Sequence, residues 1–364
     1  MKIGLVGLSQ TGKTTIFDLL TGRNKQAQDK GASGKAASNT GIGIVPDRRV
    51  DFLSDLYKPK KTTYAQIEIT DVAGFSATGE GQKSGAAKFL NDVRHCDALV
   101  YILRAFESGV LPPGLGGVNP VGELETLETE LLFADLEMIE RRAGRIKSGK
   151  KITKDSAGEK ALLERCFSCL EGGGSIVDID GLQDTEKAML QEYMFLTAKP
   201  RMAVVNQDEN QFESKSYPHK AALELECKRL GIPILELCGA MELEISQLEE
   251  EDRRLFMEDL GLSQPGIAVL AKAAYEMLGY ISFFTVGDDE VKAWTVEKGI
   301  RARHAAGKIH SDIERGFIRA EVVRFEDIEE LGSMTKAKGK GLFRLEGKEY
   351  PVVDGDVIHF RFNV

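Results

Sequence analysis

The first twenty-two residues constrain the fold more than any other stretch of the chain. Lys2–Val6 is a short apolar run, which is typical of a buried strand in a parallel sheet. Residues 7–14 read GLSQTGKT and fit the pattern G-x-x-x-x-G-K-[ST] at every fixed position. Residues 15–20 then continue as the start of an apolar-periodic helix. Strand, glycine-rich loop and helix therefore follow one another in the order that a phosphate-binding loop requires.

The residue types in this loop predict its chemistry. Gly7 and Gly12 allow a tight turn in which successive backbone N–H groups point at phosphate oxygens. We expect Lys13 to contact the β- and γ-phosphates as a catalytic charge, and the Thr14 hydroxyl to bind Mg²⁺. The predicted nucleotide-binding residues of the P-loop are Ser9, Gln10, Thr11, Gly12, Lys13, Thr14 and Thr15.

A second motif follows about sixty residues later, at the end of an alternating strand over residues 64–71. Asp71-Val72-Ala73-Gly74 fits D-x-x-G, so Asp71 is expected to hold Mg²⁺ through water and the Gly74 N–H to contact the γ-phosphate. Gly74 is therefore the second catalytic candidate. Phe75 stands where Ras-like GTPases place a water-orienting glutamine, so we expect slow hydrolysis and identify no catalytic base.

The base-recognition motif is altered. Residues 203–206 predict a strand that ends in Asn206-Gln207-Asp208-Glu209, where a GTPase has N-K-x-D. Glu209 is longer than the aspartate that accepts two guanine N–H groups, so the choice between ATP and GTP stays open. The strand and turn over residues 234–240 follow, and Cys238, Gly239 and Ala240 are expected to contact the base through their backbone.

Residues 122–196 predict an antiparallel coiled-coil hairpin inserted in the nucleotide domain. Two apolar stripes at a/d spacing would pack together: Leu124, Leu127, Leu131, Ala134 and Met138 with Leu163, Cys166, Phe167 and Leu170. The turn between them holds the densest basic cluster of the chain, made of Arg141, Arg142, Arg145, Lys147, Lys150, Lys151 and Lys154. Such a cluster is either a solvated helix face or loop tip, or a binding surface for RNA phosphates, and both alternatives stay open.

Two further segments have distinct patterns. Residues 23–45 are poor in large apolar residues and predict a loop, where a nucleotide switch protein has its first switch. Residues 280–364 predict a small α+β domain with strands over 282–286, 291–296, 318–325, 350–353 and 357–362. That domain also has a predicted helix near residues 302–312 and a basic loop containing Lys336, Lys338 and Lys340.

Composition excludes several classes of protein. The 364 residues carry a formal net charge of −9, which gives no global attraction to nucleic acid or anionic membranes. No apolar run of about 18 residues is present, and a core strand begins where a signal peptide would lie. Cys166 and Cys169 form a C-x-x-C without a second pair or a nearby histidine. We expect a cytoplasmic monomer without membrane or DNA partners.

Several further motifs resemble those of the YchF family, also called Obg-like ATPases. The resemblance covers nearly the whole chain and includes the P-loop, Val45-Pro46-Asp47, Asp71 to Gly74, Lys88-Phe89-Leu90, Val118-Asn119-Pro120 and Asn206 to Glu209. The C-terminal motifs are the most specific, and they look like the TGS domain of that family. They are the stretches SFFT (282–285), KAWT (292–295), AAGKIH (305–310), ERGFIRA (314–320) and DGDVIHF (354–360).

The resemblance implies an α/β Ras-like nucleotide domain over residues 1–121 and 197–279, a helical arm over 122–196 and a β-grasp-like TGS domain over 280–364. It also implies ATP binding at least as good as GTP binding, and association with the ribosome through the arm and the TGS domain. Lys35 stands where the family has its first-switch threonine, with Thr40 or Ser33 as substitutes, and Pro113 stands where some members have a catalytic histidine. These departures leave open a binding module that barely hydrolyses its nucleotide, and a conventional GTPase is a further alternative.

Overall fold

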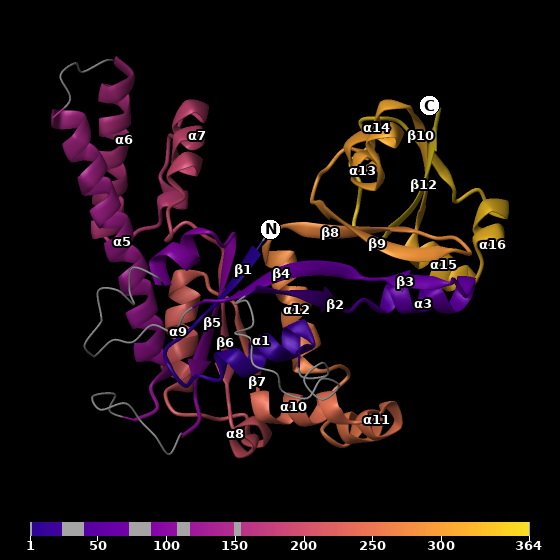
Figure 1. The fold of residues 1–364 in the computed structure, drawn as a ribbon, viewed down its shortest axis with the longest axis horizontal. Coiled ribbons are helices and arrows are strands. Elements are labelled where there is room, and N and C mark those ends of the chain that lie inside the picture. Colours follow the sequence, from indigo (N-terminus) through magenta and orange to yellow (C-terminus); the bar gives the residue numbers. More distant parts are fainter. Residues whose placement is uncertain (1, 24–39, 73–88, 108–116, 149–153, 364) are drawn as a thin grey trace, which may run out of the picture. The chain divides into compact units, whose positions relative to one another are not determined.

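The computed structural model describes residues 2–23, 40–72, 89–107, 117–148 and 154–363 (Figure 1). The chain forms two compact units, and each is built from separate segments. Unit 1 consists of Met1–Leu19, Arg23–Gly41 and Ile69–Gly266, and unit 2 of Leu20–Gly22, Ile42–Glu68 and Ile267–Val364. Residues 42–68 thus belong with the C-terminal segment, which the sequence did not indicate. The boundaries at residues 122, 197 and 280 stay predictions.

The nucleotide domain contains a six-stranded sheet with the strand order β2-β4-β1-β5-β6-β7. The strands are β1 (Lys2–Val6), β2 (Thr40–Val45), β4 (Ala65–Asp71), β5 (Ala98–Arg104), β6 (Arg201–Asn206) and β7 (Ile234–Leu237). The pairs β1–β5, β5–β6 and β6–β7 are parallel. Every residue of β5 is buried, as expected for a central strand flanked on both sides. The Ras-like α/β prediction is confirmed.

The prediction of a loop over residues 23–45 is wrong for its last six residues, because Thr40–Val45 forms β2. This strand pairs with β4 at the edge of the sheet. Its β-branched residues alternate with glycines, and Val45 is buried while Ile42 and Ile44 are exposed. Glycine lowers the local strand propensity, so the pairing with β4 decides the conformation.

Helices connect the strands of unit 1. They are α1 (Lys13–Thr21), α5 (Pro120–Ser148), α6 (Lys154–Glu171), α7 (Asp184–Tyr193), α8 (Glu209–Ser214), α9 (Lys220–Leu230), α10 (Gly239–Gln247) and α11 (Glu250–Asp259), with a 3₁₀ turn over Ile176–Asp178. Helix α1 begins at Lys13, directly after the glycine-rich loop. No helix in the described ranges is both long and apolar enough to cross a bilayer.

The predicted helical arm exists as α5 and α6, which lie side by side (Figure 1). The predicted pairing of its stripes needs one correction. Leu124, Leu127, Leu131 and Ala134 pack into the core of the nucleotide domain with residues of β5 and β6, and not against α6. Other residues of α5, from Leu132 onward and including Met138 and Ile139, pack with Leu163, Cys166, Phe167 and Leu170. One continuous stripe therefore serves two cores, which its spacing alone does not reveal.

Unit 2 contains a second six-stranded sheet with the order β11-β10-β12-β8-β9-β3. Its strands are β3 (Lys61–Thr63), β8 (Tyr280–Thr285), β9 (Glu290–Glu297), β10 (Phe317–Arg324), β11 (Arg344–Glu346) and β12 (Asp356–Phe362). Its helices are α3 (Arg48–Tyr57), α12 (Gly266–Met277), α13 (Ala302–Ile309), α14 (Ser311–Arg315), α15 (Phe325–Leu331) and α16 (Met334–Gly339). Helices α13 and α14 lie on one side of this sheet, and α3 and α15 on the other (Figure 1).

Two expectations for the C-terminal segment are wrong. Residues 350–353 form no strand, since only Pro351 makes an isolated bridge, and β11 takes the edge position instead. The expected basic loop is helix α16, whose first turn is capped by the Ser333 side chain accepting from the Lys336 N–H. A cap of this kind stabilises a short helix that has little apolar periodicity.

Candidate functional site

The P-loop adopts the conformation that its glycines predict. Gly12 has a φ of +83°, and a Cβ there would lie 2.2 Å from Nδ2 of Asn206. A Cβ on Gly7 would lie 2.7 Å from the carbonyl oxygen of Ile102. Both positions therefore require glycine. The buried Thr11 donates its hydroxyl to the Leu8 carbonyl at 3.2 Å, while Ser9 and Gln10 are exposed.

Lys13, Thr14 and Asp71 converge at the carboxyl ends of β1 and β4. The Lys13 ammonium donates to the Asp71 carboxylate and, at 2.5 Å, to the carbonyl of Val72. The Thr14 hydroxyl lies 3.3 Å from Oδ2 of Asp71. Ligands of parallel sheets bind at this edge.

The donor set fits Mg²⁺. A hydroxyl and a carboxylate are the hard oxygen ligands that this ion prefers, and it usually takes few protein ligands beside phosphates and water. The Lys13 ammonium already lies against Asp71, so this position accommodates positive charge. The two predicted metal ligands, Thr14 and Asp71, are brought together.

Asn206 links the P-loop to the loop over residues 238–240 that is predicted to contact the base. Its Nδ2 donates to the Thr11 carbonyl at 2.9 Å, and its Oδ1 accepts from the Gly239 N–H at 2.9 Å. Asn206 is 4% exposed, so both bonds are shielded from water. The asparagine of the altered motif thus holds the phosphate loop against the start of α10.

The other predicted base-contacting residues follow Asn206 in sequence or lie beside Gly239, and the Cys238 side chain makes a hydrogen bond with the Ala240 backbone. Glu209 is exposed in the first turn of α8, and Gln207 is buried with no hydrogen-bond acceptor for its side-chain Nε2 among the residues that the structure describes. Cys238 is buried at the N-cap of α10, and burial raises the pKa of its thiol. Ala240 is exposed in the first turn of the same helix. The positions of these four residues leave the choice of base a prediction.

Several sequence predictions lie outside the described residues. These are the catalytic candidate Gly74 together with Phe75, Lys35, Ser33, Pro113, Lys88, Lys150 and Lys151. Thr40 is described, and its hydroxyl lies 3.3 Å from that of Thr70 on β4. Its carbonyl accepts from Nη2 of Arg23 at 2.7 Å.

The sequence did not predict a buried pair of opposite charges, Arg104 and Glu123, that lies beside the site. Arg104 ends β5, where it is in register with Asn206, and it is only 1% exposed. Glu123, in the first turn of α5, accepts from the Arg104 backbone N–H at 2.9 Å, and its Oε1 lies 3.7 Å from Arg104 Nε. Burial raises the pKa of Glu123 to about 7 despite this cation. The helical arm is therefore fixed to the edge of the sheet that carries the site.

Known proteins resemble the chain over its full length. "Ribosome-binding ATPase YchF" of Bacillus subtilis is 39% identical, covering 99% of each chain. The protein of the same name from Haemophilus influenzae is 38% identical over 100% of this chain and 99% of its own. The chain belongs to the YchF family. A family model described as YchF-GTPase_C, a protein of unknown function, also matches residues 280–363.

Solved structures agree with this membership. The Schizosaccharomyces pombe YchF GTPase superposes with a TM-score of 0.85 at 27% identity, covering 99% of this chain and 97% of that one. A GTP binding protein of Pyrococcus horikoshii has a TM-score of 0.59 at 18% identity over the whole of both chains, which shows a shared fold. The YchF fold thus accounts for both sheets of this chain.

We expect Glu123 to make the stability of this YchF-family protein pH-dependent. Its folded pKa lies above its ordinary value, so it stabilises the fold fully below pH 4.5, and this stabilisation is lost as the pH rises through about 7. The loss amounts to about 3 kcal/mol at most. We expect the free energy of unfolding of the wild type to fall over that pH range relative to Glu123→Gln, in urea titrations followed by circular dichroism. Glu137→Gln, at an exposed site of the same helix, should behave as the wild type does; parallel pH profiles for all three proteins would contradict the prediction.

Proposed function

We propose that the chain is a Mg²⁺-dependent nucleoside triphosphatase that binds ATP, and GTP less well, and acts slowly as a translation-associated switch in the cytoplasm. The observation that carries the proposal is the convergence of Lys13, Thr14 and Asp71 beside a P-loop. The YchF relatives support it, because their names describe ATPases.

Each residue has a separate role in this proposal. The backbone N–H groups of residues 9–14 bind the phosphate oxygens, aided by the amino end of α1. Lys13 leaves Asp71 and places its charge on the β- and γ-phosphates. Thr14 and Asp71 hold Mg²⁺, which when bound neutralises phosphate charge. Asn206 holds the P-loop against Gly239 in the loop that is predicted to contact the base.

Hydrolysis is proposed to be slow. The residue after Gly74 is Phe75, and a phenyl ring cannot orient an attacking water molecule. The Gly74 N–H would still contact the γ-phosphate. Stoichiometric ATP binding without phosphate release, even with ribosomes present, would favour the alternative of a nucleotide-gated binding module.

The first prediction of the proposed function concerns the P-loop lysine. Lys13→Ala removes a charge-assisted contact with the phosphates, so ATP affinity should fall by at least about tenfold. A titration with a fluorescent ATP analogue, with and without Mg²⁺, measures this. Lys272→Ala removes an equal charge from an exposed pair on α12 and should change nothing. Unaltered binding by Lys13→Ala would refute the proposed site.

The second prediction concerns base choice. Glu209 extends one methylene beyond aspartate, so its carboxylate would not accept both guanine N–H groups in register. We expect tighter binding of the ATP analogue than of the GTP analogue by the wild type. Glu209→Asp should shift the ratio toward GTP, whereas a GTP preference already present in the wild type would identify a conventional GTPase.

The arm is the proposed contact with ribosomal RNA. Relatives are named ribosome-binding, and the end of α5 is basic. Arg141 and Arg142 are paired with Glu137 and Glu159 at 2.7 Å. Among the described residues of the cluster, Arg145 and Lys147 are exposed and form no ion pair. These two side chains are therefore the strongest candidates for phosphate contacts.

Reversal of these charges tests the arm. Arg145→Glu combined with Lys147→Glu should weaken co-sedimentation with ribosomes and reduce its salt dependence, since each lost phosphate contact lowers the salt slope by about one. Lys58→Glu combined with Lys272→Glu provides a control with the same charge change at exposed positions elsewhere. Equal co-sedimentation of both double variants would exclude the arm as the contact.

A further inference from the structure

We propose that Arg49 couples nucleotide binding to the C-terminal domain, by fixing residues 42–68 to the loop before β12. The proposal rests on the proposed function, because it takes Asp71 as part of the nucleotide site. It assigns a role to two motifs that the site does not use, Val45-Pro46-Asp47 and Asp354-Gly355-Asp356.

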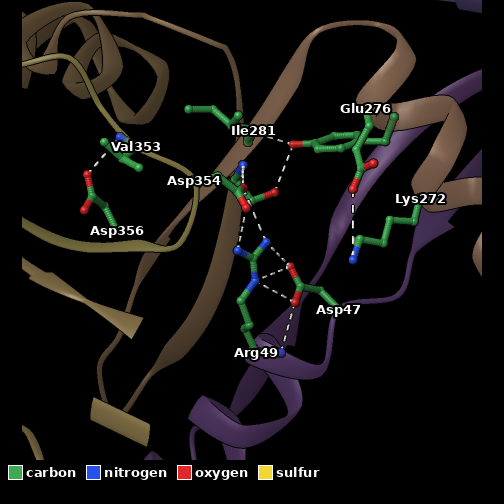
Figure 2. A network of polar contacts seen from close by, with 10 residues as sticks. Asp47, Arg49, Lys272, Glu276, Ile281, Val353, Asp354 and Asp356 are labelled. Carbon is green, nitrogen blue, oxygen red and sulfur yellow. Dashed lines mark hydrogen bonds and ion pairs between the residues drawn. The ribbon is translucent and has the colours of Figure 1, made fainter. Parts of the chain in front are cut away.

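Arg49 joins these two motifs directly (Figure 2). Its Nε and Nη2 donate to the Asp47 carboxylate at 2.8–3.1 Å, and its Nη1 donates to Oδ2 of Asp354 at 2.7 Å. The guanidinium also lies over the Phe284 ring, 5.0 Å from its centroid. The side chain is 18% exposed, and the two carboxylates raise its pKa above the ordinary value. Such a planar, shielded, two-sided pairing has a defined geometry that a lysine could not reproduce.

Both ends of this contact are themselves fixed. Asp47 caps α3 by accepting from the Arg49 N–H at 2.9 Å. Asp354 accepts from the Ser282 N–H at 2.8 Å, and the Ser282 hydroxyl lies 2.9 Å from the Tyr275 hydroxyl. Gly355 has a φ of +90°, and a Cβ there would lie 3.2 Å from Nη1 of Arg49. The loop before β12 is therefore shaped around the guanidinium.

The segment that Arg49 holds also completes the C-terminal sheet. Strand β3 pairs in parallel with β9, with Lys61 opposite Glu290 and Thr63 opposite Lys292. Phe52 of α3 packs edge-on against Phe325 at 5.6 Å between centroids. Residues 42–68 are thus part of the C-terminal domain by packing, although the paired Lys60 and Asp289 lie 229 positions apart in sequence.

The same segment leads into the nucleotide site along two strands. Strand β4 continues from residues 65–68 of unit 2 to Asp71 of unit 1. Strand β2 starts at Thr40 of unit 1 and ends at Val45, two residues before Asp47. Under the proposed function Lys13 leaves Asp71 when the nucleotide binds, and the strand that carries Asp71 is continuous with the segment that Arg49 holds. A ligand that favours one position of Asp71 thereby favours one state of that segment.

The chain contains its own reporter for the test. Trp294 is the only tryptophan, and it lies on β9. Its ring lies 3.7 Å from the ammonium of Lys292, the residue that pairs with Thr63 of β3. We therefore expect a change in the pairing of β3 with β9 to alter the surroundings of this one fluorophore through Lys292.

The experiment measures Trp294 fluorescence and direct binding together. A non-hydrolysable ATP analogue with Mg²⁺ should change the fluorescence of the wild type with the same midpoint as binding measured by calorimetry. Arg49→Ala and Asp354→Asn should keep nucleotide affinity within about fivefold of the wild type and lose most of the fluorescence change. Arg361→Ala removes an equal charge from an exposed position within the C-terminal sheet and should retain both signals.

Hydrogen exchange gives a second measurement. The Lys60 and Lys61 N–H groups donate to the carbonyls of Asp288 and Asp289, so exchange at β3 reports the docking of this segment. The nucleotide should change this exchange in the wild type and in Arg361→Ala but not in Arg49→Ala. Binding without any response of Trp294 or β3 in the wild type, or equal responses in Arg49→Ala, would overturn the inference alone. Absence of binding by the wild type would overturn the proposed function as well.

Discussion

The side-chain amide of Asn206 is the contact on which the nucleotide site depends. It satisfies a carbonyl of the P-loop and the first N–H of α10 at the same time, in a position shielded from water. A buried amide that lost either partner would cost about 1–3 kcal/mol, so the two loops hold each other in place. Gly12 and Gly239 leave room for it, since a Cβ on either would lie within 3.1 Å of that amide. The position of Asn206 therefore explains why residues 12 and 239 are both glycine, although residue 12 lies nearly 200 positions earlier in the chain.

The local parts of this arrangement could be predicted from the sequence. The P-loop, the strand that ends in Asp71 and the strand that ends in Asn206 each carry a short pattern, and parallel strands bring such ends to one edge. The pair of Arg104 and Glu123 could not be predicted, because a buried charge pair has no spacing of its own. The orientation of the Glu209 side chain could not be predicted either, because the contacts of an exposed side chain in the first turn of a helix decide where it points.

The C-terminal sheet shows a different limit. Its apolar strands were predicted, but β3 was not, because Lys61-Thr62-Thr63 has no buried alternation. These residues form a strand because they pair with β9 at the edge of the sheet, and their local propensity alone would not predict a strand. The same limit affected helix α5, whose single stripe is divided between two cores. Domain boundaries drawn along the chain therefore differ from the units that packing defines.

The ion pairs that hold residues 42–68 to the C-terminal domain are not equal. Arg48 with Glu329, Lys60 with Asp289 and Lys61 with Glu290 all involve basic side chains that are at least 71% exposed. Pairs of that kind contribute about 0–1 kcal/mol, and salt weakens them. Arg49 alone among these cations is mostly shielded and binds two carboxylates at once. Charge-assisted bonds in such surroundings contribute about 1.5–3 kcal/mol each, so the specificity of this docking is concentrated in one guanidinium. Arg49 therefore adds one shielded contact of defined geometry to the pairing of β3 with β9 and to the packing of Phe52 on Phe325, which hold the same segment without any requirement for charge.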